Sequence, residues 1–132
     1  MTTELFWLTM TALLTAVLWI PYILDRIMVR GLVGAMGNPS ADDKPQSEWA
    51  QRAMHAHRNA VENLAVFAAL VLVLHASGAA TSLTATMTMI FFYARLAHYL
   101  VYLAGVPVIR TLVFAIGWVA QMIIGLTILG IM

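Results

Sequence analysis

The sequence predicts an all-α membrane protein, in which four transmembrane helices run alternately up and down in one bundle. Hydrophobic residues make up 62% of the 132 residues and charged residues only 10%, whereas soluble domains have about 25% charged residues. Uncharged segments of about the 20 residues that a span needs recur along the chain. We expect a single transmembrane domain over residues 1–132, with spans at about 5–27, 50–76, 83–104 and 108–131.

The first predicted span begins at Leu5 and stays uncharged to Leu24. Pro21 lies near its end and is expected to kink or terminate the helix, because proline lacks the backbone N–H. The N-terminus has no basic stretch and no small-residue cleavage site, so we interpret it as a retained span and not as a signal peptide. The following polar stretch, Asp25 to Gln51, is predicted to be the only long loop.

The other three spans are separated by short turns. Residues 63–94 contain no Asp, Glu, Lys or Arg, and this stretch is too long for one span. The small-residue segment 77–82 is expected to divide it into two. The sequence Gly105-Val106-Pro107 should end the third span. After Arg110 no charged residue follows, which predicts the fourth span.

Charge composition limits orientation and partners. The basic residues flank the first and third loops, while the second loop and both termini carry none, so we expect loops one and three in the cytoplasm and the termini outside. The net charge of +1 gives no basic surface for nucleic acid. The chain has no cysteine, which excludes thiolate metal sites and a cysteine nucleophile, and we expect no metal site.

Polar side chains interrupt the second and third spans at matching depths. Measured from the turn at 77–82, Glu62 and Arg95 lie at one level, roughly 20 Å away at about 1.5 Å per residue. An arginine at the middle of a span costs at least about 2.5–3.5 kcal/mol, so we expect a Glu62–Arg95 ion pair. Asn59 should lie near His98, and the next rung should bring His55 to Tyr102. A pair of this kind can also do no more than fix the register of the helices.

Three arginines at the cytoplasmic ends of helices, Arg30, Arg58 and Arg110, have no acidic partner in this interpretation. Unbalanced positive charge around a polar pocket favours an anionic ligand. The alternative is that these side chains reach lipid headgroups or fix the topology.

Three segments resemble the MAPEG family, the membrane-associated proteins in eicosanoid and glutathione metabolism, and bacterial members in particular. The segments are Val29-Arg30 with Asn38-Pro39, then Ala56-His57-Arg58-Asn59-Ala60-Val61-Glu62-Asn63, then Ala94-Arg95-Leu96-Ala97-His98 with Tyr102, Pro107 and Arg110-Thr111. The chain departs from the pattern of several relatives at His55 and Phe114, where they have arginine and tyrosine.

The resemblance implies a homotrimer in the bacterial inner membrane that binds glutathione between adjacent subunits on the cytoplasmic side. Arg110 would be the catalytic residue, which stabilises the glutathione thiolate, and Arg95 would brace Glu62. The binding residues implied are Arg30, Arg58, Asn59, Glu62, His98, Tyr102 and Thr111.

The activity implied is that of a glutathione transferase or peroxidase acting on hydrophobic electrophiles or lipid peroxides. Two other functions remain open from the sequence. The chain could keep the fold as a non-enzymatic scaffold or lipid-binding subunit, in which the arginines need no thiol. A transporter is disfavoured, because the short spans include no pair of discontinuous helices.

Overall fold

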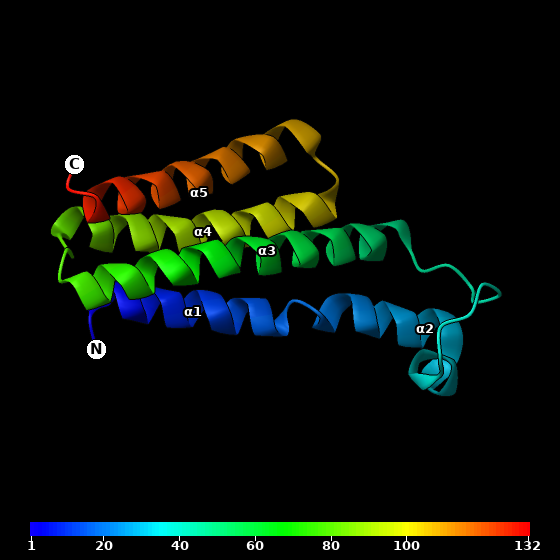
Figure 1. Cartoon of the computed structure of the whole chain (residues 1–132). Helices are drawn as coiled ribbons and strands as arrows, with labels where there is room; N and C mark the ends of the chain where they lie inside the picture. The colour runs from blue at the N-terminus through cyan, green and yellow to red at the C-terminus, as the bar shows by residue number, and fades with distance from the viewer.

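The computed structural model describes residues 1–132 and is built entirely of helices and the turns between them. Its helices are α1 (Thr3–Val17), α2 (Ile20–Met36), α3 (Glu48–Ser77), α4 (Ser82–Ala104) and α5 (Pro107–Ile128). Figure 1 shows α1 and α2 end to end along one side of the bundle. Together they form one of four segments that are long and apolar enough to cross a membrane, so the chain is an integral membrane protein with four spans.

The four spans alternate in direction, as predicted. Figure 1 places both termini and the α3–α4 turn at one end of the bundle, with the α2–α3 loop and the α4–α5 turn at the other. The predicted small-residue turn is present, since α3 ends at Ser77 and α4 begins at Ser82. Gly78 and Gly105 end α3 and α4 in the left-handed conformation, with φ of 69° and 77°.

The break between α1 and α2 follows from Pro21. Proline has no N–H to donate to the preceding turn, and α1 ends at Val17 while α2 begins at Ile20. A carbonyl freed in a membrane span needs another donor. Tyr99 provides one to Leu18, since its hydroxyl donates to the Leu18 carbonyl oxygen at 2.9 Å. The predicted kink at Pro21 is thus confirmed, and α4 braces it.

The predicted loop from Asp25 to Gln51 is too long, because α2 continues to Met36. The helix continues because its polar side chains are satisfied by the shorter loop that folds back on it. Asp25 accepts hydrogen bonds from Ser47, and Arg26 donates to Gln46. The helix changes direction at Gly31, whose φ of 74° is favourable only for glycine.

Two groups of buried side chains hold the spans together. At the end that holds the termini, Phe67 of α3 and Phe91 of α4 stack with ring centres 3.9 Å apart. Toward the other end, Ala53, Ala56 and Ala60 of α3 are buried and pack with Leu18 and Tyr99. Small side chains allow helix backbones to approach closely. The van der Waals contacts that result stabilise the packing of helices in lipid.

Candidate functional site

A cluster of polar side chains joins α3, α4 and α5, and we call it the inner cluster (Asn59, Arg95, His98, Tyr102 and Arg110). Arg95 and His98 are its buried centre, at 4% and 3% exposure. The Arg95 guanidinium donates from Nη2 to the Asn59 side-chain oxygen at 2.5 Å, and the same nitrogen lies 3.4 Å from Nδ1 of His98. The spacing of 95, 98 and 102 places these residues on one face of α4.

The outer part of the inner cluster holds the residue predicted to be catalytic. The Arg110 guanidinium carbon lies 4.4 Å from the centre of the Tyr102 ring. The Tyr102 ring also makes a T-shaped contact with the His98 ring, with ring centres 5.6 Å apart. Arg110 is half-buried and opens α5 just after the turn at Gly105. A cation over an aromatic face is held in position without losing its charge, so the guanidinium stays available to an anion.

The predicted Glu62–Arg95 ion pair is not formed within the chain. The one ion pair in the structure joins Arg30 and Asp43. The position along the chain predicts the depth of Glu62 in the bundle. It does not predict which side of α3 faces α4. The buried side of α3 carries alanines, Asn59 turns toward α4, and Glu62 lies on the exposed side. Arg95 thus has a neutral amide for its partner, and its buried Nε has no hydrogen-bond acceptor.

An exposed polar stripe runs along the outward side of α3. Its residues recur every three or four positions and are all exposed: Gln51, His55, Arg58 and Glu62. The expected contact of His55 with Tyr102 is therefore wrong. Arg52 occupies that level instead, and it donates from Nε and Nη2 to the Leu103 carbonyl at 3.1 and 2.9 Å. Charged side chains on a span seldom face lipid, so the stripe is a candidate surface for protein or ligand.

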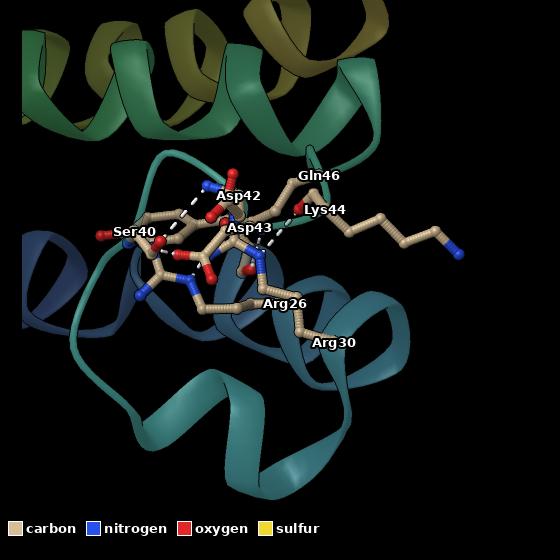
Figure 2. A network of polar contacts seen from close by, with 8 residues as sticks. Arg26, Arg30, Ser40, Asp42, Asp43, Lys44 and Gln46 are labelled. Carbon is tan, nitrogen blue, oxygen red and sulfur yellow. Dashed lines mark hydrogen bonds and ion pairs between the residues drawn. The ribbon is translucent and has the colours of Figure 1, made fainter.

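A second polar site lies between α2 and its loop (Figure 2). Arg30 lies 3.7 Å from the Asp43 carboxylate and donates from Nε to the Lys44 carbonyl at 2.8 Å. The prediction that Arg30 has no acidic partner is therefore wrong, because the loop brings Asp43 back to it. Arg58 and Arg110 have no carboxylate within ion-pair distance.

A cavity of about 370 Å³ opens beside this site, and we call it the α2–α3 cavity. Two of the predicted binding arginines lie on its wall, one from each helix. The lining residues are Arg30, Pro45, Gln46, Gln51, Met54, His55 and Arg58. An anion with several acceptors would match the charge of this wall.

Asp25 is a polar residue that the sequence reasoning did not assign to any partner. It is 4% exposed and accepts from the Ser47 N–H at 3.1 Å, from the Ser47 hydroxyl and from Gln46 Nε2 at 3.2 Å. Ser47 is the residue before α3, so Asp25 caps the start of α3 from another helix. An aspartate at the end of an apolar segment indicates that its carboxylate has a polar partner, and this feature of the sequence could have predicted the contact.

The remaining predicted residues lie apart from both polar sites. Glu62 and Thr111 are exposed, and the Thr111 hydroxyl donates to the Pro107 carbonyl within its own helix at 3.2 Å. One chain therefore presents the predicted residues on two different surfaces. Arg30, Arg58 and Glu62 lie on α2 and the outward side of α3, while Tyr102, Arg110 and Thr111 lie on α4 and α5.

Comparison with known proteins identifies the family of the chain. No characterised protein and no solved structure matched the chain. The model of the MAPEG family matches residues 5–130, which include all four spans and both polar sites. The chain therefore belongs to the MAPEG family, whose members are membrane proteins of glutathione-related metabolism.

Proposed function

We propose that this protein is a glutathione-dependent membrane transferase or peroxidase that acts on hydrophobic electrophiles or lipid peroxides. The observation that carries the proposal is the excess of positive charge in the inner cluster. Arg95 is buried with one unbonded nitrogen, and Arg110 lies over Tyr102 with no carboxylate nearby. A buried cation strongly favours a counter-ion, and glutathione has two carboxylates and a thiol.

The division of the predicted residues between two surfaces supports binding between subunits. If the outward side of α3 in one subunit met α4 and α5 of the next, the exposed stripe with Arg58 and Glu62 would face Tyr102 and Arg110. Glu62 would then suit the amine of glutathione, and the arginines its carboxylates. A closed ring of three such contacts is a homotrimer, and its interface would also remove the polar stripe from lipid.

In this proposal Arg110 is the catalytic residue. A guanidinium lowers the pKa of a nearby thiol, and the thiolate is the nucleophile. In the transferase reaction, the sulfur forms a bond to an electrophilic carbon of the apolar substrate while the leaving group departs with its electron pair. Tyr102 positions Arg110 through its ring, and its hydroxyl is one donor for the thiolate. Thr111 is the other donor, once it releases the Pro107 carbonyl.

An apolar groove on the flank of α4 and α5 favours a second candidate, a lipid-binding subunit without enzyme activity. The groove has a volume of about 580 Å³, and its lining is wholly hydrophobic: Met87, Ile90, Leu112, Ala115, Ile116, Val119, Ala120 and Ile123. It could equally hold the apolar part of an electrophilic substrate. The two candidates differ in their need for a thiol, because a lipid-binding subunit uses none.

The deciding experiment is a titration of the purified protein in detergent with reduced glutathione, read by the ultraviolet absorbance of the thiolate. We expect saturable binding and a thiolate band. Arg110→Ala should abolish the band, while Lys44→Ala, which removes an exposed cation outside the inner cluster, should leave it unchanged. Binding that is absent in the unaltered protein would favour the lipid-binding subunit. A full thiolate band in Arg110→Ala would remove Arg110 from the catalytic role.

We also propose that the end with the α2–α3 loop faces the cytoplasm, in the inner membrane of a bacterium. The support is the distribution of basic residues, which flank that loop and the α4–α5 turn. Glutathione is a cytoplasmic thiol, and both polar sites lie toward this end of the bundle.

A further inference from the structure

The end of α2 turns away from the line of the first span, and this turn gives a short segment an unusual position. Gly31 has φ 74° and ψ 166°, so the helical path is interrupted there and resumes in a new direction for residues 32–36. Figure 1 shows this end of α2 beyond the other helices of the bundle. We call residues 32–36 the turned segment.

The two sides of the turned segment differ in character. Leu32, Val33 and Met36 point outward, with exposures of 59%, 83% and 75%. On the other side, Gly34 and Ala35 line a cavity that they share with the polar loop. A Cβ at Gly34 would lie 3.2 Å from the Cβ of Arg30, which is closer than an ordinary contact. The small residues therefore lie toward the cavity and the polar loop, and the large apolar ones face away from the protein.

Hydrogen bonds between α1 and α4 fix the depth of the turned segment. Thr84 donates to Glu4 at 2.8 Å, and Tyr99 donates to the Leu18 carbonyl at 2.9 Å, so the two helices advance in step. From Glu4 at the opposite end to Gly31, the first span covers roughly 40 Å, at about 1.5 Å per residue. A bilayer has a hydrocarbon core of about 30 Å and measures about 40–45 Å with its headgroups. The turn therefore falls at the level of the headgroups.

The apolar surface of the first span continues into the turned segment. Leu24 and Met28 are 55% and 84% exposed on α2, and Leu32, just past Gly31, is 59% exposed. Lys44, on the adjoining loop, extends away from the polar network, as Figure 2 shows. Apolar side chains on one side of a short segment, at the edge of a membrane span, are typical of helices that lie in the membrane interface.

We propose that the turned segment lies flat in the headgroup region of the membrane and inserts Leu32, Val33 and Met36 between the lipids. The partner is the phospholipid surface at the end of the bundle that holds the α2–α3 loop. A lipid surface fits better than a second copy of the chain, because the segment leaves a span directly at headgroup depth and presents no polar group outward. Gly31 supplies the change of direction that keeps the segment from projecting into water.

The test uses the absence of cysteine in the chain, since a single introduced cysteine is then the only site for a nitroxide label. The variants are Val33→Cys and Met36→Cys on the outward side, Ala35→Cys on the inward side and Asp42→Cys as an exposed loop control. Each labelled protein is placed in nanodiscs of phosphatidylcholine and phosphatidylglycerol. Collisions of the label with oxygen, which concentrates in lipid, are compared with collisions with a water-soluble nickel chelate.

We expect labels at 33 and 36 to favour oxygen over nickel, the label at 35 to collide little with either, and the label at 42 to favour nickel. If labels at 33 and 36 respond to nickel as the label at 42 does, the segment lies in water and the proposal is wrong. If they collide with neither reagent, or show spin–spin broadening between chains, the segment contacts a second copy, which also overturns it. These outcomes do not depend on glutathione binding.

Discussion

The Arg110 guanidinium lies over the ring of Tyr102, 4.4 Å from its centre, at the junction of α4 and α5. The contact holds a charged side chain beside the buried Arg95 and His98 without neutralising it. Burial, a neighbouring cation and the absence of a carboxylate together give this corner of the bundle its positive character.

The ring of Tyr102 should matter more than its hydroxyl for the position of Arg110. A cation–π contact contributes about 0.5–2 kcal/mol, so Tyr102→Ala should weaken glutathione binding by roughly 2- to 30-fold. Tyr102→Phe keeps the ring and should retain most of the affinity. Calorimetric titration of both variants measures the difference. Equal losses in the two variants would show that the hydroxyl, and not the ring, is what the ligand requires.

Asn59 should stabilise the fold, because its side-chain oxygen accepts the hydrogen bond of the buried Arg95. Asn59→Leu removes the acceptor of a hydrogen bond from a buried guanidinium, which should cost about 1.5–3 kcal/mol of stability. Asn59→Asp places a carboxylate at the same position and should restore stability by forming the ion pair that the chain lacks. Thermal unfolding in detergent compares the two. We expect Asn59→Asp to weaken glutathione binding, since the carboxylate neutralises Arg95, and unchanged binding would contradict this role.

Asp25 should stabilise the start of α3. Asp25→Ala removes a carboxylate that accepts three hydrogen bonds, two of them from Ser47. One bond to a charged group contributes about 1.5–3 kcal/mol, so the loss should be at least that large. Asp42→Ala is the control, because Asp42 is exposed and its carboxylate makes no hydrogen bond. Similar unfolding midpoints for the two variants would show that Asp25 is not a cap.

Tyr99 should stabilise the break between α1 and α2. Tyr99→Phe keeps the ring but leaves the Leu18 carbonyl without its donor, which should cost about 1–3 kcal/mol. Tyr93→Phe is a matched control on the same helix, because Tyr93 is 54% exposed. Hydrogen exchange at residues 18–23 should also rise in Tyr99→Phe alone. Unchanged exchange there would mean that the kink is held by packing.

The number of spans, their direction and most of their ends could be predicted because the causes are local. Proline kinks or ends a helix, as Pro21 does in the first span. The turn at 77–82 follows from the limit that bilayer thickness sets on the length of a span. The third span was expected to end at 104, and α4 ends at Ala104. These features depend on residues close together in sequence.

The partners of the polar side chains could be predicted only in part. Counting residues from the turn gave the level of Arg95 but not the rotation of α3, and so Asn59 took the place expected for Glu62. Asp43 reaches Arg30, and Ser47 reaches Asp25, only because the loop folds back over α2. Contacts of this kind depend on the path of the loop, which no periodicity in the sequence records.

The outward polar stripe of α3 has a consequence for how the protein is made. A single chain inserted into lipid would leave Arg58 and Glu62 facing hydrocarbon or defects of water within it, at a cost of several kcal/mol. Association that covers the stripe recovers this free energy, so assembly and folding are thermodynamically linked. We therefore expect the unfolding midpoint to rise with the ratio of protein to lipid, and dilution into excess lipid to shorten the lifetime of the folded chain.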